Sequence, residues 1–370
     1  MMPRAVSHVL QQVEPMPRLF KRRIMVEAMK EAAQRPMPLK LAGDLWSEGE
    51  LVLLFAESGV GKTAFATQIA NDIAGSQSTT GLTVETEAQR VLDYDMELSD
   101  IQQLQRYADI ERNGDGRRHF TNLYDFNPNF ERVEIDPNAR VFDTFTNWEK
   151  ILTEEIENET VESKSKVIIL DNLTALTHEA DKAKGALPLM HRLNEMKKAH
   201  GLSIMVLCHT PKRDESRPLS LNDLAGSRIL ANLADSVVGI GKSVIDQRIR
   251  YVKQFKVRSG EMVYSADHVG VFQFEKTDNH LGFTLIGHSK ESSHLIKQTD
   301  EAKDKLIADI QAMSTAGKSQ REIASDLQIS LGMVNRHLKT AKASKNGDGR
   351  IKIEFSDPER KRQWESYLQK

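Results

Sequence analysis

The sequence predicts an α/β fold, in which helices flank a largely parallel sheet, with a small all-α domain near the C-terminus. Six short apolar runs between residues 51 and 257 are rich in branched aliphatic side chains and do not alternate with polar ones. Runs of this kind are typical of strands buried on both faces of a parallel sheet. Helical stretches separate several of the runs, as the connections between parallel strands require.

The predicted elements follow one another along the chain. Apolar residues at helical spacing between residues 19 and 34 predict an amphipathic helix on an N-terminal arm. Residues 271–288 predict a hairpin that turns near Asp278-Asn279 and closes the central domain. The predicted strands between these elements occupy residues 51–55, 90–96, 166–171, 202–208, 234–240 and 248–257.

Composition restricts the class of protein. The chain has 370 residues, of which 39% are hydrophobic and 28% charged, as in globular proteins. No apolar run approaches the ~20 residues that a membrane span needs, and the N-terminus lacks the apolar core of a secretory signal. Cys208 is the only cysteine, which excludes disulfide scaffolds and Cys-based zinc sites. We therefore expect a cytoplasmic protein with no membrane partner.

The net charge of −2 hides a segregation of charge along the chain. It is the sum of +5 over residues 1–40, −11 over residues 41–289 and +4 over residues 290–370. Basic ends around an acidic centre are what a chain with two functions would show, although solvated basic termini are also common. Net charge alone therefore does not exclude nucleic acid as a partner.

A phosphate-binding loop follows the first predicted strand. The sequence Ala-Glu-Ser-Gly-Val-Gly-Lys-Thr lies between this strand and a helix, which is the context that a P-loop requires. The small residues let backbone N–H groups surround phosphates, and the helix N-terminus adds a positive dipole. We expect Lys62 to reach the outer phosphates of ATP and Thr63 to bind Mg²⁺. The predicted nucleotide-binding residues are Ala56, Glu57, Ser58, Gly59, Val60, Gly61, Lys62, Thr63 and Ala64.

Two positions in this region need interpretation. The first glycine of the usual P-loop pattern is Ala56 here, which we interpret as a tolerated variant, since only a positive φ would require glycine. Asp171 ends a later apolar strand, where its carboxylate could hold Mg²⁺ through water or simply cap a loop. Its pairing with a P-loop favours the metal site.

The strand end Val-Leu-Asp-Tyr-Asp-Met-Glu-Leu-Ser-Asp at residues 91–100 resembles the second core strand of RecA-like ATPases of the RepA and DnaB hexameric helicase type. By this resemblance Glu97 is the general base that polarises the attacking water. Residues 202–212 resemble the strand that ends in a polar γ-phosphate sensor, which implies that role for His209. The resemblance covers about residues 40–289, but residues 100–165 do not align with the short helicase cores.

Residues 254–261, Gln-Phe-Lys-Val-Arg-Ser-Gly-Glu, resemble the stretch in which these helicases supply cations to a neighbouring subunit. The resemblance implies that Lys256 and Arg258 reach the nucleotide of the next subunit in a homo-hexamer or other ring, with Arg228 as the competing candidate. An arginine supplied in trans would make hydrolysis depend on assembly. The alternative is that this pair forms the solvated edge of a strand.

Nucleic acid would contact two parts of the chain. In RecA-like rings, the loops that correspond to residues 178–187 and 211–220 face a central channel that holds single-stranded DNA, although mobile surface loops also carry such charges. Residues 317–339 resemble the helix-turn-helix of resolvases and response regulators, with a capping box from Ser319 to Glu322. A helical module for protein contacts is the alternative. The predicted DNA-binding residues are Lys182, Lys184, Lys212, Arg213 and Arg217 for the channel, and Ser330, Asn335, Arg336 and Lys339 for duplex DNA.

Together these patterns predict an ATP- and Mg²⁺-dependent nucleic-acid motor, related to the replicative helicases of plasmids, phages or other mobile elements. Two alternatives stay open: a DNA-binding regulator switched by nucleotide, and a recombination or repair ATPase that does not unwind DNA. The predicted segments are a basic helical arm at 1–40, a RecA-like ATPase domain at 41–289, a linker at 290–301, the helix-turn-helix domain at 302–345 and a charged tail at 346–370.

Overall fold

The computed structural model describes most of the chain. The described residues are 20–114, 116–136, 138, 148–172, 183–210, 213–224, 228–295, 300–327, 329, 331–335 and 338. No helix among them combines the length and apolar character that crossing a bilayer requires.

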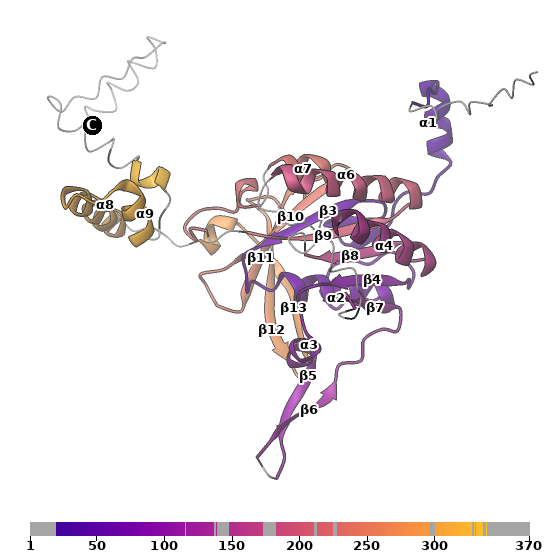
Figure 1. Cartoon of the computed structure of the whole chain (residues 1–370), viewed down its shortest axis with the longest axis horizontal. Coiled ribbons are helices and arrows are strands. Elements are labelled where there is room, and N and C mark those ends of the chain that lie inside the picture. Colours follow the sequence, from indigo (N-terminus) through magenta and orange to yellow (C-terminus); the bar gives the residue numbers. More distant parts are fainter. Residues whose placement is uncertain are drawn as a thin grey trace, which may run out of the picture.

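A nine-stranded sheet forms the centre of the molecule (Figure 1). Its strand order is β13-β12-β11-β10-β3-β9-β8-β4-β7. The six strands from β10 to β7 are mutually parallel, and the three strands at the other edge are antiparallel. The bounds are β3 Leu51–Ala56, β4 Val91–Asp95, β7 Phe130–Val133, β8 Val167–Asp171, β9 Ser203–His209, β10 Ser236–Lys242, β11 Ile249–Lys256, β12 Val269–Thr277 and β13 His280–Ser289.

Both faces of the parallel strands are covered by helices. Leu51, Leu53 and Phe55 of β3 belong to a buried cluster with side chains of α4 (Trp148–Glu162), α6 (Ala183–His200) and α7 (Arg228–Leu233). The alternate residues Val52 and Leu54 belong to a second cluster with side chains of α2 (Lys62–Gly75). Successive strand residues point to opposite faces, so a strand buried on both faces is apolar throughout. This explains the non-alternating runs of the sequence.

The predicted α/β class with a largely parallel sheet is confirmed. The six predicted strands correspond to β3, β4, β8, β9, β10 and β11, and the predicted hairpin to β12 and β13. The hairpin turns at Asp278, which adopts a left-handed φ of 50°. An aspartate tolerates this conformation better than most side chains, so the turn chemistry was visible in the sequence.

A small helical unit follows the sheet domain. It contains α8 (Asp300–Thr315), α9 (Gln320–Asp326) and a helical stretch at 331–335. Ile310, Ile323 and Val334 form its buried core. The predicted capping box is confirmed, since the Ser319 hydroxyl accepts the Glu322 N–H and the Glu322 carboxylate accepts the Ser319 N–H. The start of α9 is therefore determined by a local sequence signal.

The elements that the sequence did not reveal lie mainly between residues 100 and 133. They are α3 (Asp100–Tyr107), a projecting hairpin of β5 (Ala108–Arg112) and β6 (Arg118–Leu123), and the edge strand β7 (Figure 1). A further pair, β1 (Lys40–Ala42) and β2 (Trp46–Ser47), precedes β3. The predicted N-terminal helix is shorter than its pattern, at α1 (Met25–Ala33), and it buries none of its residues.

Candidate nucleotide-binding and hydrolysis site

The predicted site residues meet at the carboxyl edge of the parallel strands. Ala56 at the end of β3 pairs with His209 at the end of β9, and Asp95 at the end of β4 pairs with Asp171 at the end of β8. The P-loop leaves β3 at this edge and leads into α2, which begins at Lys62. Loops at the carboxyl ends of open parallel sheets are the usual location of ligand sites in α/β proteins.

Backbone geometry explains the residue choice in the P-loop. Gly61 has a φ of 108°, and a Cβ atom there would lie 2.9 Å from ring atoms of Phe274 and Phe283. Only glycine suits both the conformation and the space. Ala56 instead ends β3 and has no positive φ, so this position does not require the glycine of the usual pattern.

Lys62 and Thr63 at the start of α2 form a largely buried polar cluster with Asp171 at the end of β8. The Thr63 hydroxyl donates to Asp171 Oδ2 at 2.6 Å, and Lys62 Nζ lies 3.7 Å from Asp171 Oδ1. Asp171 Oδ1 is buried and accepts no hydrogen bond from the described residues. Burial raises the pKa of Asp171, against the lowering effects of Lys62 and Thr63. A hydroxyl beside a carboxylate with a spare oxygen is a donor set that Mg²⁺ prefers, so these residues fit the expected metal.

Glu97 faces this cluster across a cavity of about 310 Å³, which is lined by the P-loop, Glu97, Arg106 and His209. Its Oε2 accepts a 2.8 Å hydrogen bond from the Asn172 amide and lies 3.7 Å from His209 Nε2. The Asn172 nitrogen also lies 2.9 Å from His209 Nε2. His209, Asn172 and Lys62 lower the pKa of Glu97 to about 2, although burial acts in the opposite direction. Glu97 is therefore a firmly ionised carboxylate that points toward the P-loop cavity.

Two arginines of this site were not found from the sequence. Arg106 of α3 lines the cavity, and its Nη1 is buried without a hydrogen-bond partner among the described residues. Arg250 of β11 donates from Nε to the Val60 carbonyl of the P-loop at 2.8 Å. Neither arginine lies in a local motif, so only the folded chain identifies them.

Lys256 and Arg258 lie near the amino ends of the parallel strands, at the end of the sheet opposite to the P-loop. Lys256 donates to the carbonyls of Ala231 and Ala234 at 2.9 and 2.7 Å, just where α7 ends. Arg258 pairs with Asp235 at 2.8 Å, and Asp235 accepts the N–H of Leu51, the first residue of β3. The P-loop follows the last residue of β3, so this pair is remote from the P-loop of its own chain. The side chain of the competing candidate, Arg228, lies outside the described part of the structure.

The predicted DNA-binding residues are only partly described. The Arg213 side chain is 9% exposed, and its guanidinium donates a hydrogen bond to the Arg217 carbonyl. Its Nη1 also lies 3.8 Å from Asp223 Oδ2, so Arg213 is bound by residues of its own chain. Arg217 is half-exposed and lies 3.2 Å from Asp214. Asn335 is partly buried in the helical stretch 331–335, and for Lys184 only the backbone in α6 is described. The remaining predicted residues, Lys182, Lys212, Ser330, Arg336 and Lys339, lie outside the described residues.

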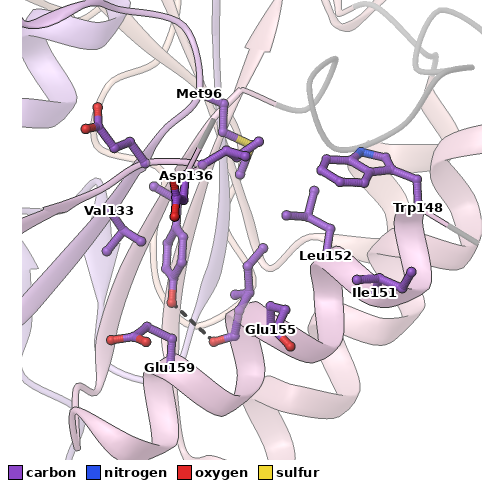
Figure 2. Close-up of a pocket in the computed structure, with 12 residues that line it drawn as sticks. Met96, Val133, Asp136, Trp148, Ile151, Leu152, Glu155 and Glu159 are labelled. Carbon is purple, nitrogen blue, oxygen red and sulfur yellow. Dashed lines mark hydrogen bonds between the residues drawn. The ribbon is translucent and has the colours of Figure 1, made fainter. Parts of the chain in front are cut away.

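A second cavity, of about 300 Å³, lies beside α4 and the ends of β4 and β7 (Figure 2). Its walls are mainly apolar and include Met96, Val133 and Trp148. Four carboxylates also line it, those of Glu134, Asp136, Glu155 and Glu159. It shares none of its residues with the P-loop cavity.

The family comparison agrees with this geometry. Residues 17–215, more than half of the chain, match the AAA domain family AAA_25. The chain belongs to this family. AAA_25 proteins are P-loop ATPases of the RepA and DnaB helicase type. The matched region contains the P-loop, Glu97, Asp171 and His209, and it ends before Lys256 and Arg258. Membership supports nucleotide binding, usually with Mg²⁺, and ATP hydrolysis for this AAA domain.

Proposed function

We propose that this AAA-family chain is a DNA-dependent ATPase that works as a ring-shaped, replicative-type helicase of a plasmid, phage or mobile element. The proposal of ATP hydrolysis rests on one observation. The ionised Glu97, held by Asn172 and His209, lies opposite the P-loop in one cavity. A carboxylate at this place can orient a water molecule in line with the γ-phosphate.

The residues would divide the work as follows. Lys62 binds the outer phosphates, while Thr63 and Asp171 hold Mg²⁺, which would neutralise phosphate charge. Glu97 orients water by accepting its hydrogen bond. Because a pKa of about 2 makes Glu97 a weak proton acceptor, orientation is its main contribution until the negative charge of bound triphosphate raises this pKa. Arg106, which lines the cavity, would supply a further positive charge within the same chain.

The positions of Lys256 and Arg258 support the proposal of a ring-shaped assembly. These cations are remote from the P-loop of their own chain. If a neighbouring chain packed against the amino ends of the parallel strands, they could contact the nucleotide bound to that chain. Heterologous contacts of this kind close into rings when the rotation between subunits allows it. Single-stranded DNA would then pass near the loops that contain Arg213 and Arg217.

The test is strand displacement on forked DNA by the wild type and Glu97→Gln. Glutamine keeps the size of the side chain but removes the charge that holds the water. We expect ATP turnover to fall by about 100-fold or more, unwinding to be lost, and binding of a fluorescent ATP analogue to be kept. Glu87→Gln, at an exposed glutamate outside the cavity, is the matched control. If the wild type hydrolysed ATP but unwound no fork, the proposed helicase activity would be refuted.

A DNA-binding regulator switched by nucleotide is the second candidate. The helical unit of α8 and α9, with its confirmed capping box, favours it because the same stretch resembles a helix-turn-helix. Footprinting of the full chain on its own upstream DNA separates the two. A regulator would protect one sequence with ATP-dependent affinity, whereas a motor would protect none in particular.

A further inference from the structure

Asp95 is a buried carboxylate at the end of β4, two residues before Glu97. Its side chain is 1% exposed. Tyr94 and Met96, its neighbours in the chain, line the apolar cavity of Figure 2, so Asp95 points to the other side of the strand. An apolar residue would be the ordinary choice for such a buried position.

One oxygen of Asp95 holds the backbone of the turn that carries Glu97. Asp95 Oδ1 accepts the N–H of Glu97 at 3.1 Å and the N–H of Leu98 at 2.9 Å. Aspartate side chains that accept backbone N–H groups two or three residues ahead stabilise turns of this kind. The direction in which Glu97 leaves β4 therefore depends on this carboxylate.

The other oxygen connects the turn to two further elements. Asp95 Oδ2 accepts hydrogen bonds at 2.9 Å from Gln103 of α3 and at 2.9 Å from Nε of Arg132 on β7. Arg132 also donates to the carbonyl of Leu98 and, at 2.6 Å, to Asp100. The Asp95 carboxylate thus holds the N–H groups of Glu97 and Leu98. The Arg132 guanidinium, which is bonded to the same carboxylate, holds the Leu98 carbonyl and Asp100.

We infer that Asp95 is a positioning residue for Glu97, with Arg132 as its counter-charge. This inference rests on the role of Glu97 under the proposed function. The Glu97 side chain is anchored by Asn172, and its backbone is anchored by Asp95, so two independent contacts define where its carboxylate lies. Catalytic groups need placement to within about 0.5 Å, which a free turn on the surface does not provide.

The test compares turnover with nucleotide binding in Asp95→Ala. We expect turnover at saturating ATP to fall by about 10- to 100-fold, the loss that a misplacement of about 1 Å produces. The affinity for a fluorescent ADP analogue should stay within about threefold of the wild type, since Asp95 does not line the P-loop cavity. Asp95→Asn keeps an oxygen for the two N–H groups and should lose less turnover. Asp109→Asn, on the projecting hairpin, is the matched control.

The double variant Asp95→Ala/Glu97→Gln decides whether Asp95 acts through Glu97. If it does, the single-turnover rate of the double variant equals that of Glu97→Gln alone, because the misplaced group is already disabled. A further drop, or a parallel loss of ADP affinity, would show a general structural role and overturn the inference. Wild-type turnover in Asp95→Ala or, if that variant does not fold, in Asp95→Asn would also overturn it, while leaving the proposed function intact. Wild-type turnover in Glu97→Gln would instead contradict the proposed function itself.

Discussion

Asp93 and Asp171 are buried carboxylates on neighbouring strands, and they differ in what compensates their charge. Asp171 has Thr63 and Lys62 beside it. Asp93 is 4% exposed, and its Oδ1 has no hydrogen-bond partner among the described residues. Burial, followed by the charges of Asp171 and Asp95, raises the pKa of Asp93 well above its usual range, and the charge of Arg132 acts in the opposite direction. At residue scale, Asp93 is therefore a destabilising group when it ionises.

Asp93→Asn should stabilise the folded chain, and more so at high pH. Because the folded-state pKa of Asp93 is raised, folding is favoured below the unfolded-state pKa of about 4 and loses stability as the pH rises toward the folded-state value. Asparagine mimics the neutral acid and does not titrate. We expect a gain of about 1–3 kcal/mol in the free energy of unfolding at pH 8 and a smaller gain at pH 5. Melts followed by tryptophan fluorescence at both pH values measure this, with Asp109→Asn as the control. An equal gain in the free energy of unfolding at both pH values would contradict a raised pKa of Asp93.

At the scale of elements, the antiparallel strands shape the P-loop from outside the parallel core. Arg250 of β11 is buried, donates to Val60 of the P-loop and lies over the Phe274 ring at 5.0 Å. Its Nη1 also donates to the Gln247 carbonyl at 2.6 Å. Phe274 and Phe283, from the hairpin β12–β13, leave no space for a side chain at Gly61. Strands about two hundred residues after the P-loop thus restrict its conformation.

Arg250→Lys should weaken nucleotide binding without unfolding the domain. Lysine keeps the charge but lacks the planar guanidinium, so it cannot bind Val60 and Gln247 together. Loss of one such contact should cost about 1.4 kcal/mol, or about tenfold in the affinity for an ATP analogue. Titration of a fluorescent analogue measures the change. Arg248→Lys is the matched control, because Arg248 is mostly exposed and pairs with Asp246. Equal affinities for the two variants would argue against support of the P-loop by β11.

At the scale of the whole molecule, the sheet separates the two halves of the proposed catalytic machinery. The P-loop and Glu97 lie at the carboxyl edge of the parallel strands, and Lys256 and Arg258 lie at the opposite edge. A single chain cannot bring them together without refolding its core. Assembly of chains in a head-to-tail manner would do so, which is why we connect the ring to hydrolysis.

Mixing two inactive variants should therefore restore activity. Lys62→Ala removes a chain's own nucleotide site, and Arg258→Ala removes the cation that it offers to a neighbour. In a random mixture, about a quarter of the interfaces combine an intact P-loop with an intact arginine, so about a quarter of wild-type turnover should return. The control mixes Arg258→Ala with a Lys62→Ala/Arg258→Ala chain, which cannot complement it. Full activity of Arg258→Ala alone, or no recovery in the mixture, would refute action in trans.

Features that depend on neighbouring residues could be predicted from the sequence alone. Buried parallel strands, the P-loop, the hairpin at Asp278 and the capping box at Ser319 all have their causes within a few positions, so their patterns can be recognised locally. Family resemblance added Glu97 and His209. The edge strand β7 and the hairpin β5–β6 were missed because nearly all of their residues are only partly buried or exposed and carry no clear period.

Contacts between distant residues depend on the tertiary structure. The contacts of Asn172 with Glu97, Arg132 with Asp95 and Arg250 with Val60 join residues 75, 37 and 190 positions apart. No local pattern marks such pairs, because each forms only when the sheet has its strand order and register. The same order places Lys256 and Arg258 away from their own P-loop. Local sequence patterns thus predicted most of the elements and the presence of the phosphate loop, whereas the long-range pairing of strands brought the hydrolytic site together.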